Sequence, residues 1–180
     1  MKVTVVGAGM VGSTTALRLL EDGLASRLVL VDVIEGLAKA VALDLAQAAP
    51  LRGHPTDIVG GSDYGPTEGS DLVVITAGLP RKPGQSRADL LATNAEIVRG
   101  VVQEVAPRSP EAVMVVVTNP LDEMTTLAWR VSGFPPERVV GMAGVLDTSR
   151  FRYFVAAELG TTPDRVEAIV LGSHGETMVP

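Results

Sequence analysis

A residue that transfers protons near neutral pH is most often a histidine, and this sequence contains two, His54 and His174. His54 lies in the polar stretch Arg52-Gly53-His54-Pro55, which is typical of a solvated loop. His174 lies in Leu171-Gly172-Ser173-His174-Gly175, directly after an apolar stretch that is typical of a strand. Active sites of parallel sheets gather where strands end. His174 is therefore the candidate for acid–base chemistry, although a structural histidine fits the same position.

A glycine-rich segment near the N-terminus has the pattern of a phosphate-binding turn. Gly7-Ala8-Gly9-Met10-Val11-Gly12 fits G-x-G-x-x-G between an expected strand and an expected helix. The first glycine of this pattern permits a tight turn, the second lets the backbone approach a pyrophosphate, and the third lets the helix lie close to the strand. The helix N-terminus then offers unpaired N–H groups to the phosphates. The pattern predicts a dinucleotide site, although a chance match has the same form.

Asp32 indicates which dinucleotide binds. It ends the expected second strand, twenty residues after Gly12. A carboxylate at this spacing accepts hydrogen bonds from the adenosine ribose and repels a 2′-phosphate, so NAD is favoured over NADP. Two alternatives stay open, because flavin proteins share the glycine pattern and because Asp32 also fits a simple turn at a strand end.

The overall composition limits the classes of partner. A formal net charge of −6 argues against a nucleic-acid or acidic-membrane binder. An anionic ligand must therefore meet a local basic cluster, which Arg81, Lys82 and Arg87 supply. The absence of cysteine excludes disulfides, thiol catalysis and thiolate metal sites and suits a reducing compartment. We expect no metal site. No stretch approaches the ~18 apolar residues of a membrane helix, and the first apolar run, which stops at Gly7, is expected to be a strand and not a signal peptide.

Short β-branched runs alternate with longer amphipathic stretches, which is the pattern of a parallel sheet with helices on both faces. Strands are predicted at 2–6, 28–32, 56–60, 71–76, 112–117, 138–141 and 166–171. Helices are predicted at 11–22, 37–48, 87–106, 121–132 and 147–159, with Pro50, Pro107, Pro110 and residues 133–136 where helices should stop. The predicted fold class is α/β, a doubly wound parallel Rossmann sheet.

Four further segments resemble the ordered motifs of the lactate/malate dehydrogenase family, and the resemblance runs from residue 2 to the last residue. Four motifs in order are far more specific than any one of them. The segments are Ala77-Gly78-Leu79-Pro80-Arg81-Lys82-Pro83-Gly84-Gln85-Ser86-Arg87, Thr118-Asn119-Pro120-Leu121-Asp122, Gly144-Val145-Leu146-Asp147-Thr148-Ser149-Arg150 and Gly172-Ser173-His174-Gly175. The resemblance implies NAD-dependent, reversible hydride transfer between a 2-hydroxyacid and a 2-oxoacid.

The resemblance also implies which residues carry this chemistry. His174 would protonate the carbonyl oxygen of oxaloacetate as the nicotinamide delivers hydride, and would take the proton back when malate is oxidised. Asp147 would accept a hydrogen bond from the other ring nitrogen and stabilise the imidazolium. Arg150 would bind the carboxylate beside the reacting carbon, and Arg87 would polarise the carbonyl. The residues alone leave open an ordinary i, i+3 surface pair of Asp147 and Arg150.

The implied cofactor and substrate contacts include both asparagines of the sequence. Asn119 would orient the substrate oxygen and, with Val117 and the backbone of residues 77–78, would line the nicotinamide ribose. Asn94 would contact the cofactor. The full implied NAD site consists of Gly7, Ala8, Gly9, Met10, Val11, Gly12, Asp32, Asn94, Val117 and Asn119.

Position 81 separates the two branches of the family. By the resemblance, lactate dehydrogenases carry a neutral glutamine there, whereas an arginine pairs with the second carboxylate of malate or oxaloacetate. Arg81 therefore predicts a dicarboxylate substrate. With pyruvate, the guanidinium would face a methyl group and be left unpaired. This predicts a preference for oxaloacetate over pyruvate of ~10³-fold or more. Lactate or another 2-hydroxyacid is the alternative substrate.

The alternation of elements changes after Gly141, where we expect a domain boundary. Residues 1–143 are predicted as a Rossmann domain that binds NAD, and residues 144–180 as the beginning of an α+β catalytic domain. Because family members continue through further strands and helices, we expect residues 1–180 alone to have little dehydrogenase activity. A pure dinucleotide-binding module is the competing hypothesis. The family pattern further predicts a homodimer or homotetramer in the cytoplasm.

Overall fold

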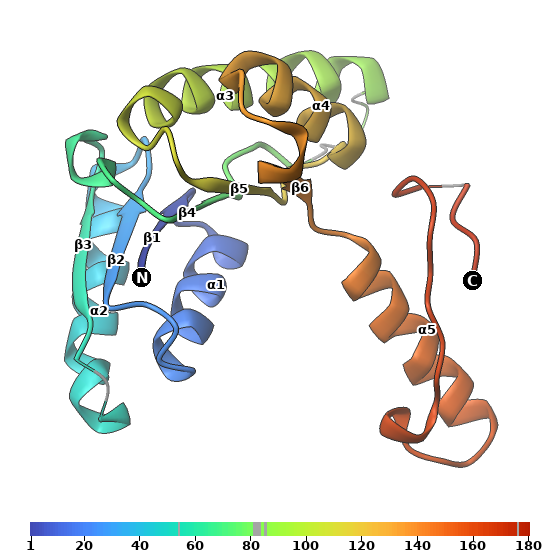
Figure 1. Ribbon diagram of the computed structural model, residues 1–180. Coiled ribbons are helices and arrows are strands. Elements are labelled where there is room, and N and C mark those ends of the chain that lie inside the picture. The colour runs from blue at the N-terminus through green and yellow to red at the C-terminus, as the bar shows by residue number, and fades with distance from the viewer. Residues whose placement is uncertain (54, 81–83, 85, 176) are drawn as a thin grey trace.

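Six parallel strands form one sheet in the computed structural model, which describes residues 1–53, 55–80, 84, 86–175 and 177–180. The strand order is β3-β2-β1-β4-β5-β6 (Figure 1). The strands are β1 (Lys2–Val6), β2 (Arg27–Val31), β3 (Asp57–Gly61), β4 (Leu72–Ile75), β5 (Val113–Val116) and β6 (Val139–Gly141). Because the pairing is parallel throughout, the carboxyl ends of all six strands lie at one edge of the sheet. The predicted Rossmann sheet is confirmed.

Helices cover both faces of this sheet (Figure 1). The helices are α1 (Met10–Glu21), α2 (Glu35–Arg52), α3 (Arg87–Arg108), α4 (Leu121–Ser132) and α5 (Gly144–Glu158), with short 3-10 helices η1 (Gly65–Thr67), η2 (Pro136–Arg138) and η3 (Pro163–Arg165). Alternate strand residues enter two separate cores, so that Leu28 and Leu30 pack under α1 and α2, whereas Val29 and Val31 pack under α3 and α4. Across the described residues, no helix is long and apolar enough to cross a membrane.

Two helices continue past prolines that were expected to stop them. Helix α2 continues past Pro50 to Arg52, and α3 continues past Pro107 to Arg108. Each proline lies in the last turn, where it removes a single intrahelical hydrogen bond. Helix α2 instead ends at Arg52 and is capped by Gly53, whose left-handed φ of 71° suits a glycine.

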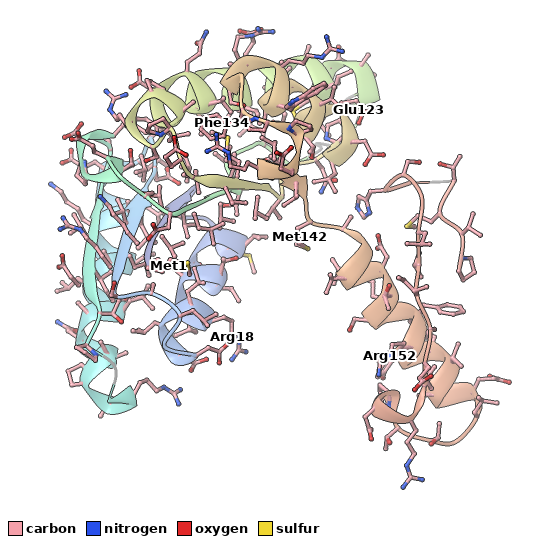
Figure 2. The ribbon with its side chains drawn as sticks, viewed as in Figure 1. Met1, Arg18, Glu123, Phe134, Met142 and Arg152 are labelled. Carbon is pink, nitrogen blue, oxygen red and sulfur yellow. The ribbon has the colours of Figure 1, made fainter. Side chains whose placement is uncertain are left out.

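The chain leaves the sheet after β6, and α5 extends away from it with the C-terminal segment lying alongside (Figure 1). The guanidinium of Arg152, labelled in Figure 2, donates a hydrogen bond of 2.8 Å to the carbonyl oxygen of Pro163 and so ties α5 to η3. The predicted strand at 166–171 is wrong. Within the described residues this segment makes a single antiparallel bridge, between Leu171 and Val179. A strand requires a row of partner main-chain groups, and one bridge does not supply it.

Gly60 in β3 allows α2 to pack directly against the edge of the sheet. A Cβ atom on Gly60 would lie 2.1 Å from the carbonyl oxygen of Ala38 and 2.7 Å from Cβ of Ala42. At the neighbouring Gly61, the nearest atom to an added Cβ would be the amide nitrogen of Asp63, at 4.0 Å.

We predict that Gly60→Ala lowers the free energy of unfolding by about 3 kcal/mol, because the collision is with main-chain atoms that cannot move independently of α2. Gly61→Ala is the matched control and should change it by less than about 0.5 kcal/mol. Urea denaturation followed by circular dichroism measures both. Equal destabilisation by the two substitutions would contradict this account of the packing.

Candidate active site

The segments that carry the predicted site follow strands at the carboxyl edge of the sheet. The glycine turn follows β1, Asp32 follows β2, Ala77 follows β4, and the segment around Asn119 follows β5. The strand order changes direction between β1 and β4, which are neighbours although the intervening chain forms β2 and β3. Such a switch point is where open α/β sheets bind ligands.

The geometry of the glycine turn fits a pyrophosphate. Gly7 has a φ of 100°, which strongly favours glycine. A Cβ atom on Gly12 would lie 1.7 Å from the carbonyl oxygen of Gly7, so α1 can lie this close to the turn only without a side chain there. Gly9 caps α1 without a side-chain hydrogen bond, and its own added Cβ would meet no protein atom within 4 Å. The N–H groups at the start of α1 are therefore next to space that an anion can enter.

Thr76, which the sequence analysis missed, holds this turn against the end of β4. Its hydroxyl lies 3.1 Å from the carbonyl oxygens of both Val6 and Gly7, and its one hydrogen is shared between these two acceptors. The same oxygen would be 2.7 Å from a Cβ atom on Gly7. The one available sequence signal was a polar residue directly after a buried strand.

The carboxylate of Asp32 is hydrogen-bonded on both sides. Oδ2 accepts a hydrogen bond of 2.7 Å from the amide of Ala8, and Oδ1 accepts one of 2.9 Å from the amide of Ile34. Asp32 thereby fixes the glycine turn relative to the end of β2. Apolar side chains of the adjoining segments are exposed, with Met10 at the start of α1 at 88% and Val33 directly after Asp32 at 95%. A dinucleotide offers a ribose to such a carboxylate and an apolar base to such side chains.

The ends of β4 and β5 are joined by side chains as well as by strand pairing. The hydroxyl of Thr118 donates a hydrogen bond of 2.7 Å to the carbonyl oxygen of Ala77. The amide of Val117 donates one of 2.9 Å to the carbonyl oxygen of Ile75. Asn94, on α3, is 1% exposed, and its amide bonds to the main chain of both segments.

Helix α3 begins at Arg87 because Ser86 and Asp89 form a capping box. The amide of Asp89 donates to the Ser86 hydroxyl at 3.1 Å, and the amide of Ser86 donates to the Asp89 carboxylate at 3.2 Å. The hydrogen bonds from the side chain and the backbone of Ser86 lower the pKa of Asp89 below its ordinary value. The capping box therefore fixes the main chain at Arg87, the first residue of α3. The structure does not describe the side chain of Arg87. Arg81, Lys82 and His54 lie outside the described residues.

His174 and Asp147 are hydrogen-bonded partners. Nδ1 of His174 lies 2.8 Å from Oδ2 of Asp147, which is in the first turn of α5 and only 8% exposed. The other carboxylate oxygen, Oδ1, lies 3.6 Å from the guanidinium of Arg150, whose side chain is 61% exposed. Asp147 is thus placed between an imidazole and a guanidinium.

A second carboxylate, Asp122, connects His174 to helix α4. It lies in the first turn of α4, and its Oδ2 accepts a hydrogen bond of 3.1 Å from the backbone amide of His174. A surface hollow of about 340 Å³ opens beside His174 and is also lined by Asp122, Thr125 and Gly144. In the sequence Asp122 stands out only as part of a motif, because nothing local predicts a partner 52 positions away.

The structure brings the predicted residues together in three groups. His174, Asp147 and Arg150 form one group, and the glycine turn with Asp32 forms another. The third group consists of Asn94 with the segment that contains Val117 and Asn119. Within the described ranges, no set of three or more histidine, aspartate and glutamate side chains is arranged to hold a metal ion.

Comparison with known families and proteins covers the whole chain. Residues 1–141 match the family described as lactate/malate dehydrogenase, NAD binding domain, and residues 144–180 match lactate/malate dehydrogenase, alpha/beta C-terminal domain. A malate dehydrogenase from Thermomicrobium roseum is 58% identical over 179 residues, which cover 99% of this chain and 58% of that protein. The chain therefore spans a little over half the length of the curated relatives it matches.

Solved structures agree with these matches. Malate dehydrogenase from Salinibacter ruber is similar with a TM-score of 0.92 and 49% identity, over 100% of this chain and 57% of that one. Malate dehydrogenase from Archaeoglobus fulgidus, solved in complex with NADH, gives a TM-score of 0.92 at 40% identity, over 99% and 60% of the two chains. Lactate dehydrogenase from Cryptosporidium parvum, solved with lactic acid and cofactor, gives 0.93 at 41% identity, over 99% and 56%. By sequence and by fold, the chain belongs to the lactate/malate dehydrogenase family, and its first 141 residues correspond to the NAD-binding domain of that family.

Proposed function

We propose that this chain supplies the cofactor domain and the acid–base pair of an NAD-dependent malate dehydrogenase. The proposed reaction is reversible hydride transfer between malate and NAD, which gives oxaloacetate and NADH. Residues 1–143 would form the NAD-binding domain, and residues 144–180 would form the beginning of the catalytic domain. The observation that carries the proposal is the 2.8 Å hydrogen bond between Nδ1 of His174 and the buried carboxylate of Asp147.

The cofactor site is proposed from the glycine turn and Asp32. When bound, the nicotinamide would supply or accept the hydride at the reacting carbon. The start of α1 would bind the pyrophosphate, because its N–H groups and helix dipole attract an anion. The Asp32 carboxylate would accept the ribose hydroxyls in addition to the backbone hydrogen bonds that already orient it.

His174 would act as the general acid in reduction and the general base in oxidation. Because Nδ1 bonds to Asp147, the ring would carry its Nδ1 proton towards that carboxylate, which leaves Nε2 to exchange a proton with the substrate oxygen. The negative charge of Asp147 would stabilise the imidazolium that precedes proton donation to oxaloacetate. Its burial strengthens this attraction, because less water screens the two groups.

The substrate is proposed to be a dicarboxylate held by arginines. Arg150 would bind the carboxylate next to the reacting carbon, and Arg81 would bind the second carboxylate with a bidentate fork. Arg87 would polarise the carbonyl as negative charge develops on its oxygen, and Asn119 would orient that oxygen. Asp147 contacts both His174 and Arg150, so one side chain would set the spacing between the acid and the carboxylate-binding residue.

Lactate oxidation is the second candidate, because the Cryptosporidium parvum lactate dehydrogenase is as similar in fold as the malate enzymes. The identity of residue 81 favours malate, since an arginine facing a methyl group would be left unpaired. Assembly as a homodimer or homotetramer and a cytoplasmic location stay predictions from the family resemblance.

The substrate assignment predicts the effect of Arg81→Gln in the native full-length protein. The ratio of kcat/KM for oxaloacetate to that for pyruvate should fall by about 100-fold or more, because the substitution removes the partner of the second carboxylate. Steady-state NADH oxidation with each oxoacid measures the ratio. As a control, His174→Asn should slow both reactions by at least ~100-fold without changing the ratio. An unchanged ratio in Arg81→Gln would refute the malate assignment.

The cofactor assignment predicts that Gly9→Ala and Gly12→Ala fail in different ways. Gly9→Ala should lower the melting temperature only slightly, by the cost of an alanine at the helix N-cap, because its methyl group meets no protein atom within 4 Å. It should weaken NADH binding by about 10-fold or more, because the methyl group occupies the approach of the pyrophosphate. Gly12→Ala should destabilise the fold, because its methyl group would lie 1.7 Å from the Gly7 carbonyl oxygen. Fluorescence titration with NADH and thermal denaturation separate the two effects. Unweakened NADH binding by Gly9→Ala would contradict the proposed pyrophosphate position.

A further inference from the structure

The side chain of Asn94 is fully engaged by the main chain of two separate segments. Its Oδ1 accepts a hydrogen bond of 2.8 Å from the amide of Leu79. Its Nδ2 donates to the carbonyl oxygen of Leu79 at 3.2 Å and to the carbonyl oxygen of Asn119 at 2.6 Å. Asn94 lies within α3 and is 1% exposed. One buried amide therefore bonds to both main-chain groups of Leu79 and also to Asn119.

The three partners define both the residue type and the orientation of the amide. A reversed amide would direct its NH₂ group at the Leu79 N–H and its oxygen at two carbonyl oxygens. An aspartate of the same shape would place an acceptor against those carbonyl oxygens. Asparagine alone combines this length with one acceptor and two donors.

The two segments that Asn94 joins are those that lead to the proposed substrate residues. Leu79 is two positions before Arg81, and the other bonded residue is Asn119 itself. The segments are pressed together at Gly78, where an added Cβ would lie 2.6 Å from Cγ2 of Thr118 and 3.4 Å from Oδ1 of Asn94. A side chain at position 78 would separate the two segments that the Asn94 amide joins.

We propose that Asn94 is a positioning residue, which sets the spacing between the main chain at Leu79 and at Asn119 and so between two segments that bind the substrate. The proposal rests on the proposed function for the role of these segments. It differs from the cofactor contact that the family resemblance implied for Asn94. Both Nδ2 hydrogens bond to backbone carbonyls and the residue is 1% exposed, so the amide has no donor to offer NAD.

The test compares Asn94→Asp and Asn94→Ala with Ser109→Ala in the native full-length protein. Ser109 is a matched control, because it is also 1% exposed and bonded to the main chain, accepting from the Ser70 amide at 3.0 Å and donating to the Thr67 carbonyl oxygen at 2.8 Å. It caps the opposite end of α3, away from the carboxyl edge of the sheet. Loss of its hydroxyl tests the general effect of losing a buried polar contact.

We expect both Asn94 variants to weaken NADH binding by no more than about 3-fold, through the displaced segment at Asn119 that also lines the nicotinamide ribose. They should lose about 10-fold or more in kcat/KM for oxaloacetate, because a small displacement of substrate-binding groups has a large kinetic effect. Hydrogen–deuterium exchange of the peptide that contains the Leu79 amide should become faster in Asn94→Ala, which removes the acceptor of that N–H, and less so in Asn94→Asp, which keeps an acceptor but loses both donors. Ser109→Ala should lower the melting temperature and leave NADH binding, kcat/KM and exchange at Leu79 unchanged.

Three results would overturn the proposal. An equal loss of NADH affinity and kcat/KM would make Asn94 a cofactor contact. Unchanged kinetics and unchanged exchange in the Asn94 variants would show that the amide has no positioning role. An equal loss of kcat/KM in Ser109→Ala would show that the loss follows from lower stability and not from the position of Asn94. Failure of the proposed function is a separate outcome, since it would appear as an inactive wild-type protein, while exchange at Leu79 tests the Asn94 contact without any substrate.

Discussion

Parallel pairing of β1 with β4 is the constraint on which the site depends. Four residue pairs, from Val3 with Leu72 to Val6 with Ile75, bring together segments about seventy positions apart. Since the two strands run in the same direction, the glycine turn and the segment after Ile75 emerge side by side at the carboxyl edge. The glycine turn and the segment that leads to Leu79 are placed directly by this pair of strands, and Asp32 and Asn119 follow the strands on either side of the pair.

Irregular main chain at that edge lacks the hydrogen bonds that a sheet would supply, and buried groups of this kind need partners. Side chains that contact no ligand in the proposed mechanism provide them. Thr76 bonds to the glycine turn, Thr118 to Ala77, and Asn94 to the segments after β4 and β5. The geometry offered to cofactor and substrate is therefore held by a small set of buried hydroxyl and amide groups.

Much of this arrangement was predictable because it is encoded locally. Alternating apolar runs predicted the six strands of the sheet and the helices between them, since periodicity requires only neighbouring residues. The glycine pattern and Asp32 predicted a dinucleotide site from spacing alone. The pairing of His174 with Asp147 was predicted only through the family resemblance, and the two side chains are hydrogen-bonded. Helix ends near Pro50 and Pro107 were predicted a few residues early.

The tertiary structure decided which distant groups meet. The segment 166–171 has the apolar character of a strand, but one bridge to Val179 does not make a ladder. The bond from the His174 amide to Asp122 and the three bonds of Asn94 join residues 15 to 52 positions apart. The sequence by itself determined the six strands of the sheet, the five main helices and the residue chemistry, because these depend on local pattern. The partners of a buried amide or carboxylate depend on how the elements pack, and only the folded chain fixes that.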